Sequence, residues 1–299
     1  MITINNIPLH IKKYYCAKAD GKYIEKKDNR LWLYVCITDY CPGKCPFCVN
    51  RCSRTSSVGN SFDLSQFKKV FEQILPWIDG VSITGGDPLA DIKLLAQVTR
   101  FMEKILPDTY ELDLVTSGYE LEKLPEIDVS RYSTIHLSRH RVKDEDNSKI
   151  IGSFAPPLKE VERVLGQLPD KGAAVLNCVL SDDGVCNTSM AAEYLDMVGS
   201  IGIENTSFIG MFLANDYCRK HYVSPKDLKF TEDRRFRIWN TYHDHEYCSC
   251  SSGDYRSKYG LVRFYYRCPG TETSDYCRQL VYSADNHLRA GFGNSKIII

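Results

Sequence analysis

The sequence predicts an α/β fold: a partial (β/α)6 TIM-like barrel that carries a small cysteine-rich C-terminal extension. Six short runs rich in β-branched and aromatic residues alternate with longer segments whose apolar residues recur at helical spacing, as expected for a parallel sheet. After residue 210 the pattern changes to Tyr-, Arg- and Cys-rich sequence with turn signals. We therefore expect an N-terminal extension over residues 1–30, the barrel over 31–210 and the C-terminal extension over 211–299.

The composition narrows the class of protein. The chain has 299 residues, of which 43% are apolar and 25% charged, as is typical of a globular protein. Its 38 basic residues balance 38 acidic ones, which predicts no binding to a large nucleic acid or to a membrane surface. The N-terminus lacks a signal-peptide pattern, so the 13 cysteines indicate reduced thiols that serve metals. We expect a cytoplasmic protein.

The first half of the barrel begins with a strand over residues 31–38, where aromatic and β-branched residues dominate. Apolar residues then follow helical spacing up to residue 78, and Asp63 and Gln66 are placed like a capping box. A second strand is expected over 80–84 and a second helix over 88–106.

The alternation continues through the second half. Strands are expected over 110–115, 133–137, 173–180 and 203–209, and helices over 120–124, 157–168 and 188–200. In such a barrel the functional groups gather on the loops that follow the C-terminal ends of the strands.

The loop after the first strand holds three cysteines, Cys41, Cys45 and Cys48, in a C-x3-C-x2-C pattern. Disulfides between such close neighbours would strain the chain, so the thiols are predicted to be metal ligands. A structural zinc ion usually takes a fourth protein ligand. Three thiolates with one open place fit a four-iron, four-sulfur (4Fe-4S) cluster. An overlapping set of three ligands is the alternative, in which Cys52 joins Cys45 and Cys48.

This loop, with Phe47 just before its last cysteine, resembles that of the radical S-adenosylmethionine (SAM) enzymes. The segment Gly85-Gly86-Asp87-Pro88 resembles the family's Gly-Gly-Glu-Pro motif, which contacts the amino group of SAM, although Asp replaces the commoner Glu. Thr116-Ser117-Gly118 is similar to the family's third-strand segment. The resemblance implies a set of SAM-binding residues: Phe47, Gly85, Gly86, Asp87, Thr116, Ser117, Ser138, Arg139 and Asn177. Strand-end turns and a hydrogen-bonded core Asn177 are the alternatives from the residues alone.

The C-terminal third contributes a second set of cysteines, Cys248, Cys250, Cys268 and Cys277. They are candidates for an auxiliary 4Fe-4S cluster, with a zinc site or unligated thiols as alternatives. The segment from Cys277 to residue 292 resembles part of the molybdenum-cofactor cyclases and of SPASM or twitch extensions. Asn286 stands where those families have Gly, and Gly291 where they often have another ligand. No terminal Gly-Gly is present, so the cyclase activity itself is not expected.

The resemblance implies a radical SAM enzyme with Cys41, Cys45 and Cys48 as catalytic metal ligands. Such an enzyme cleaves SAM reductively to a 5′-deoxyadenosyl radical, which abstracts a hydrogen atom from a peptide or natural-product-like substrate. An electron donor such as flavodoxin or ferredoxin is implied as a partner.

A nucleotide-like substrate held by His136, His140 and Arg141 is the alternative within enzymes. A non-catalytic, cysteine-rich metal or electron-transfer protein is the alternative outside them. No leader-peptide-binding domain of about 80 residues is expected at either end.

Overall fold

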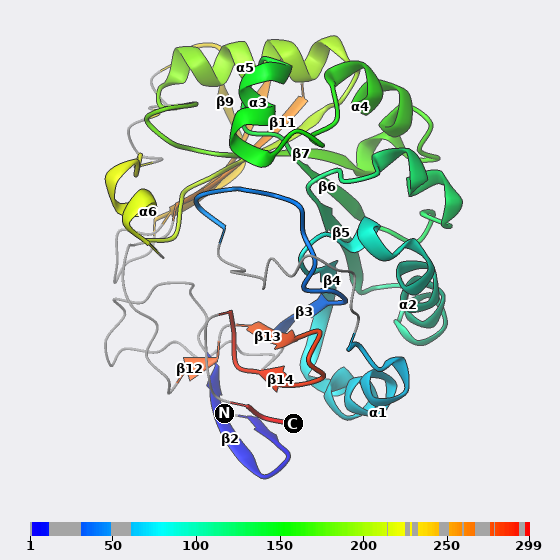
Figure 1. Ribbon diagram of the computed structural model, residues 1–299. Coiled ribbons are helices and arrows are strands. Elements are labelled where there is room, and N and C mark those ends of the chain that lie inside the picture. The colour runs from blue at the N-terminus through cyan, green and yellow to red at the C-terminus, as the bar shows by residue number, and fades with distance from the viewer. Residues whose placement is uncertain are drawn as a thin grey trace.

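The structure is a computed structural model, and its parallel sheet confirms the predicted α/β class (Figure 1). It describes residues 2–11, 31–48, 61–213, 215–224, 228, 233–244, 251–258, 260–266, 276–277, 279–292 and 297–299. The six predicted barrel strands are present and adjacent in chain order: β3 (Leu31–Cys36), β4 (Ile78–Thr84), β5 (Glu111–Thr116), β6 (Thr134–Ser138), β7 (Ala174–Val179) and β8 (Asn205–Ile209).

Each pair of neighbours among these six strands is parallel. Figure 1 shows the strands following a curved arc with the helices on its outer side. The outer helices are α1 (Leu64–Ile74), α2 (Ile92–Ile105), α4 (Leu158–Leu165) and α5 (Thr188–Ser200). The described strands form an open sheet that does not close into a full barrel.

The two faces of the sheet differ in polarity. On β6, Ile135 and Leu137 are buried in the core shared with the helices, whereas Thr134, His136 and Ser138 point to the opposite face. We call this concave, inner face the lumen. The other strands alternate in the same register, and the apolar outer row includes Leu33, Val81, Leu112, Leu114, Leu176 and Phe208. Burial of each such side chain contributes about 1.5–3 kcal/mol.

Side-chain caps begin several of the helices. Asp63 accepts hydrogen bonds from the N–H groups of Ser65 and Gln66 at the start of α1, as the capping pattern predicts. Asp91 and Asn187 cap α2 and α5 in the same way. Short 3-10 turns complete the connections: η1 (Leu75–Trp77), η2 (Pro88–Asp91), η3 (Leu121–Glu126) and η4 (Lys171–Ala173). The expected helix over 120–124 is the 3-10 turn η3.

One helix of the barrel lies where the sequence patterns predict none: α3 (Asp144–Ile151) follows β6. It is rich in acidic residues at its first turn, which favours a helix N-terminus, but only Asn147 and Ile151 are buried. Its short apolar stripe explains why periodicity misses it.

The strands of residues 211–299 extend the same sheet at both ends. One edge continues with β11 (Gly260–Tyr266), β10 (Ser251–Ser257) and β9 (Arg237–Asp244), and the other with β13 (Gln279–Tyr282) and β14 (Leu288–Arg289). β11 is parallel to β8, and β13 is parallel to β3. A separate small sheet joins β1 (Ile2–Ile4), β2 (Ile7–Ile11) and β12 (Tyr276–Cys277). The boundary at residue 210 therefore stays a prediction, since residues on both sides of it share one sheet.

Candidate cluster and cofactor site

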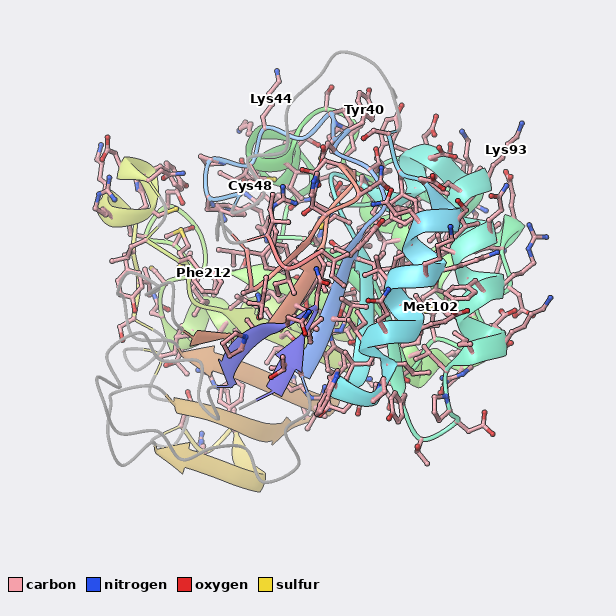
Figure 2. The ribbon with its side chains drawn as sticks, turned by 90° about the horizontal axis from the view of Figure 1, so that it is seen from below. Tyr40, Lys44, Cys48, Lys93, Met102 and Phe212 are labelled. Carbon is pink, nitrogen blue, oxygen red and sulfur yellow. The ribbon has the colours of Figure 1, made fainter. Side chains whose placement is uncertain are left out.

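The cysteine loop leaves the C-terminal end of β3 and lies at one end of the molecule. Figure 2 shows Tyr40, Lys44 and Cys48 together there, with the side chain of Lys44 directed into solvent. Cys41, Cys45 and Cys48 are cysteines outside any disulfide, and all three are half-buried. The Cys48 N–H donates to the Cys45 carbonyl at 3.2 Å, which closes a turn, and the Lys44 N–H donates to the Ile151 carbonyl of α3 at 2.6 Å. The unpredicted helix α3 thus anchors the loop.

The thiols of this loop do not converge on one point. Within the described part of the chain, only Asp182, Asp183 and His221 form a trio of metal-ligand types with ligand atoms within 4.8 Å of one another. At least two of the three cysteine sulfurs therefore lie more than 4.8 Å apart. Burial raises the pKa of Cys41 to about 11, while the Gly43 N–H, 3.3 Å from its sulfur, lowers it. Such a thiol becomes a thiolate when a cation binds it.

Gly85 and Gly86 pack directly against the backbone that leads into Cys41. The Gly86 N–H donates to the Thr38 carbonyl at 2.6 Å, and the Asp87 N–H donates to the Tyr40 carbonyl at 2.8 Å. A Cβ atom on Gly86 would lie 2.1 Å from the Tyr40 oxygen, and Gly85 has φ near 141°. Only glycine fits this approach. The two glycines therefore fix the start of the cysteine loop, whatever else they bind.

The Asp87 carboxylate is fully buried and points to the end of β5. It accepts hydrogen bonds from the hydroxyl of Thr116 at 2.8 and 3.0 Å, from the N–H of Ser117 at 2.8 Å and from the Ser117 hydroxyl. The Leu89 N–H adds a further bond at 3.0 Å. Burial raises the pKa of Asp87, and the hydrogen bonds of Ser117 and Thr116 oppose this shift. A hydrogen bond of Ser117 also lowers the pKa of Cys41, so Ser117 links Asp87 to the cysteine loop.

Ser138 and Arg139 lie at the end of β6 but face different ways. Ser138 continues the lumen row of that strand. Arg139 is 1% exposed, and its guanidinium donates to the Val142 carbonyl and to Asp144, both at 2.7 Å. These bonds hold the loop between β6 and α3. A role for Arg139 in binding the SAM carboxylate stays a prediction, because its present contacts are structural.

Asn177, a predicted SAM-binding residue, belongs to a hydrogen-bonded group on the lumen face. Its side-chain oxygen lies 3.1 Å from Nδ1 of His136, whose Nε2 lies 2.8 Å from the Thr134 hydroxyl, which in turn donates to Asp113 at 2.6 Å. Asp113 and Thr134 were not candidates. The available signal was the polar residue at every second position of β6 and at position 113 of the neighbouring strand.

Phe47 joins the cysteine loop to residues beyond the expected barrel boundary. Its ring contacts the ring of His140 at 4.9 Å and that of Tyr217 at 6.4 Å between centroids. Tyr217 belongs to the short helix α6 (Asp216–Lys220), whose cap Asn215 donates to the Pro46 carbonyl at 2.8 Å. Phe47, Met211 and Cys218 form a small buried cluster. Residues 211–213 and 215–222 therefore cover the cysteine loop.

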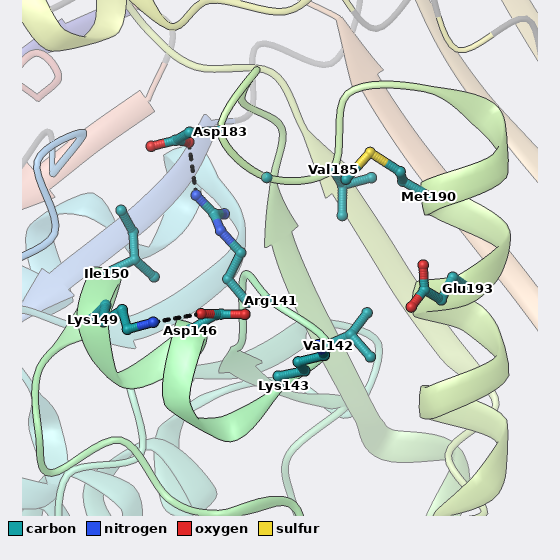
Figure 3. A pocket seen from close by; sticks show the side chains of 11 residues that line it. Arg141, Val142, Lys143, Asp146, Lys149, Ile150, Asp183, Val185, Met190 and Glu193 are labelled. Carbon is teal, nitrogen blue, oxygen red and sulfur yellow. Dashed lines mark hydrogen bonds and ion pairs between the residues drawn. The ribbon is translucent and has the colours of Figure 1, made fainter.

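A pocket of about 390 Å³ lies beyond the ends of β6 and β7, between α3 and α5 (Figure 3). Its charged groups are largely paired: Arg141 contacts Asp183 at 2.7 Å, and Lys149 contacts Asp146 at 2.8 Å. His140 is buried, which lowers its pKa to about 3, so its ring is neutral. The basic residues considered for a nucleotide-like substrate are thus engaged within the protein.

The second cysteine set falls mostly outside the described residues. Cys248, Cys250 and Cys268 lie there, as does Cys52, while Cys277 is described only as part of β12, where it pairs with Ile11. No helix in the described ranges has the length and hydropathy needed to cross a membrane.

The fold and the rim together define an enzyme domain with a partial parallel barrel and a three-thiol metal loop at the end of its first barrel strand. Residues 35–182 match the family model of the radical SAM superfamily. The chain therefore contains a radical SAM domain and belongs to that superfamily of enzymes, which use a 4Fe-4S cluster and SAM.

One solved structure agrees at the level of the fold: SuiB from Streptococcus suis bound to S-adenosylmethionine aligns with a TM-score of 0.58 and 15% identity, over 90% of this chain and 63% of that chain. Two further structures align with lower scores. SuiB bound to its precursor peptide SuiA gives a TM-score of 0.45 at 17% identity, over 60% and 39%. Native anSMEcpe with bound AdoMet gives 0.43 at 15% identity, over 68% and 57%. The chain thus spans between 39% and 63% of the length of the chains in these three structures.

Proposed function

We propose that Cys41, Cys45 and Cys48 bind the 4Fe-4S cluster and leave one iron open for SAM. The observation that supports this most is the position of three half-buried cysteines in one short loop at the end of β3, in a chain of the radical SAM superfamily. When bound, the cluster supplies one electron to SAM, and cleavage yields methionine and a 5′-deoxyadenosyl radical. A reduced flavodoxin or ferredoxin in the cytoplasm is the proposed electron source.

The residues around the thiols position the cofactors. Gly85 and Gly86 hold the start of the loop, and Asp87 with Thr116 and Ser117 forms a buried hydrogen-bonded support next to Cys41. Phe47 and the α6 segment cover the other side of the loop and exclude water from it. Ser138 and Asn177 extend from this rim into the lumen, where the adenosyl group of SAM and the substrate meet in this proposal.

We infer that the substrate is a peptide or a natural-product-like molecule. The unclosed sheet supports this inference, because a barrel whose edge strands do not pair with each other is better suited than a closed one to a substrate larger than a free metabolite. The pairing of Arg141 with Asp183 and the neutral His140 argue against a phosphate-bearing nucleotide at the β6 loop.

The proposed function predicts that anaerobically reconstituted protein, reduced with dithionite, converts SAM to 5′-deoxyadenosine. Cys45→Ala should lower cluster iron and abolish this product, because three thiolates are needed to hold the cluster. Liquid chromatography of the products and an iron assay measure both. Cys186→Ser is the matched control, because Cys186 lies against Met190 at 3.5 Å, away from the loop. Cluster-loaded, reduced wild-type protein that forms no 5′-deoxyadenosine would contradict the proposal.

We also propose an auxiliary 4Fe-4S cluster bound by Cys248, Cys250, Cys268 and Cys277. The parallel pairing of β12 with β2 supports it, because it holds the backbone of Cys277 against a second strand. Wild-type protein should bind about eight irons per chain and Cys268→Ala about four. About four irons in both proteins would show that only the first cluster is present.

A further inference from the structure

Polar side chains form a continuous group on the lumen wall. The strand register places Ser82 beside Asp113, and Asp113 beside Thr134. Nearer the rim, Ser138, Asn177, Ser207 and Arg263 lie side by side across four strands. Ser207 is 2% exposed, and its hydroxyl has no hydrogen-bond partner among the described residues. A buried hydroxyl without a partner is costly, so Ser207 marks a place on this wall for a polar ligand.

Within this wall a chain of hydrogen bonds runs from Asp113 to Asn177. The Thr134 hydroxyl lies 2.6 Å from Oδ1 of Asp113 and 2.8 Å from Nε2 of His136. Nδ1 of His136 lies 3.1 Å from Oδ1 of Asn177. A carboxamide oxygen only accepts, so the hydrogen is on Nδ1, and Nε2 of the neutral ring is an acceptor.

This geometry has room for one additional proton. The Thr134 hydroxyl has a single hydrogen, so it can donate to Asp113 or to His136, but not to both. Both contacts become hydrogen bonds when Asp113 is protonated: the carboxyl group donates to Thr134, and Thr134 turns to donate to Nε2 of His136. Protonation of Asp113 therefore completes the chain, whereas the ionised form leaves Nε2 without a donor.

We propose that Asp113 is a base on the lumen wall that accepts a proton from a hydroxyl or amino group of the substrate, with Thr134 and His136 as positioning residues. The substrate O–H or N–H bond breaks, its electron pair stays on the oxygen or nitrogen, and the proton bonds to the Asp113 carboxylate. No oxidant is required. The inference rests on the proposed function, because hydrogen abstraction from a carbon that bears such a group makes its O–H or N–H much more acidic.

The electrostatic surroundings suit this role. Burial raises the pKa of Asp113 to about 6, and Glu111 on the same strand raises it as well, while the bond from Thr134 and the charge of Arg263 on β11 lower it. Burial lowers the pKa of His136, the bond to Asn177 raises it, and Arg263 lowers it further. Oδ2 of Asp113 lies 3.9 Å from Nε2 of His136, and the two side chains keep 12% and 17% of their surface exposed. Asp113 is thus accessible from the lumen, and its pKa lies close to the pH at which enzymes work.

The test is a pH titration of the histidine ring signals by NMR, on cluster-loaded, oxidised protein labelled at its seven histidines. His136→Gln identifies the signal of His136. In the wild-type protein this signal should show a second step from Asp113, with apparent pKa values separated by about one unit or more. Asp113→Asn and Thr134→Val should both remove the second step. Thr134→Ser, which keeps the hydroxyl, should restore it.

Two results would overturn the inference: a His136 signal that shows no second step in the wild-type protein, or a second step that Thr134→Val leaves unchanged. The signal of His140, which is buried and bonded to the Val179 N–H, reports whether each variant keeps the native fold. The titration needs no SAM cleavage. Absence of 5′-deoxyadenosine from wild-type protein would therefore count against the proposed function alone.

Discussion

At the scale of single residues, the structure bears most directly on whether Asp87 contacts SAM itself or acts through its neighbours. The motif resemblance predicts a carboxylate that contacts the SAM amino group, whereas the carboxylate in the structure accepts bonds from Thr116, Ser117 and Leu89. A shorter side chain explains the difference, because Asp lacks one methylene of the commoner Glu and reaches its own strand neighbours instead. We infer that Asp87 acts on SAM through Ser117 and the cysteine loop.

The variant Asp87→Glu decides whether the carboxylate contacts SAM directly or acts on it through Ser117 and the cysteine loop. An added methylene at this fully buried site should cost about 1–3 kcal/mol of stability and displace Ser117 from Cys41. SAM binding to cluster-loaded protein should therefore weaken, as measured by isothermal titration calorimetry under anaerobic conditions. Asp87→Asn serves as the control of equal size, since it removes the charge and part of the acceptor capacity. Equal or tighter SAM binding by Asp87→Glu would favour the direct contact.

The sequence predicts which residues lie at the rim of the barrel, but not the direction in which each side chain points. Cys41, Gly85, Thr116 and Ser138 lie after consecutive strands, and parallel strands necessarily bring these ends together. Direction depends on contacts that lie outside the strands themselves. Arg139 turns away from the lumen toward Asp144, which lies on a helix without a strong apolar pattern and offers it a carboxylate. Such a pairing leaves no signal in a single sequence.

At the scale of elements, helix α6 and the cysteine loop depend on one amide side chain. The Asn215 side chain accepts from the Cys218 N–H at 2.9 Å, which caps α6, and donates to the Pro46 carbonyl at 2.8 Å. Asn215 therefore holds the cover over the loop while it starts the helix. The short length of α6 and the aromatic contacts of Phe47 make this arrangement tertiary in origin, so the pattern of residues 211–222 alone does not predict it.

We predict that Asn215→Asp loosens the cysteine loop without removing the helix cap. The carboxylate can still accept from Cys218, but it cannot donate to Pro46, and two acceptor oxygens then face each other at a cost of about 1–3 kcal/mol. Air should bleach the cluster of this variant faster than that of the wild-type protein, as followed by absorbance near 400 nm. Asn187→Asp, a change of the same kind at the α5 cap, is the control and should leave the rate unchanged.

The strands were more predictable than the connections between them. All six barrel strands follow from short β-branched and aromatic runs, because burial on both faces or on the helix side leaves a strong apolar signal. The helix α3 and the added strands β9 to β11 were not predicted. The position of these strands follows from the pairing of β11 with β8, which is set by the whole sheet.

At the scale of the whole molecule, the interior of the barrel combines an apolar shell with a polar lumen. The helices bury the outer face of the sheet, and buried histidines lie at the boundary between the two environments. His140 is 3% exposed, and its Nδ1 accepts from the Val179 N–H at 3.1 Å. A proton on this nitrogen would break that bond and place a charge in the core. The fold therefore requires a neutral His140.

This requirement predicts how stability depends on pH. Burial lowers the pKa of His140 to about 3 in the folded protein, while the unfolded chain takes up its proton near 6.5. Below pH 6.5 the unfolded state then binds more protons than the folded state. The contribution of His140 to the free energy of unfolding is therefore complete above that pH and is lost as the pH falls toward 3. Between pH 6.5 and 5 the loss should reach about 2 kcal/mol. Urea unfolding of the cluster-free, reduced protein at several pH values measures it.

His140→Gln separates this effect from those of other groups. Glutamine can accept a hydrogen bond but does not titrate, so the variant should be less stable at pH 7.5 yet lose less stability on going to pH 5. The lowered pKa of His136 and the raised pKa of Asp113 affect both proteins equally. Their effects therefore cancel in the difference between the two free energies of unfolding. If the free energies of unfolding of the two proteins ran parallel from pH 7.5 to 5, His140 would already be charged or solvated in the native state. The contact between the His140 and Phe47 rings would then be too loose to hold the cysteine loop.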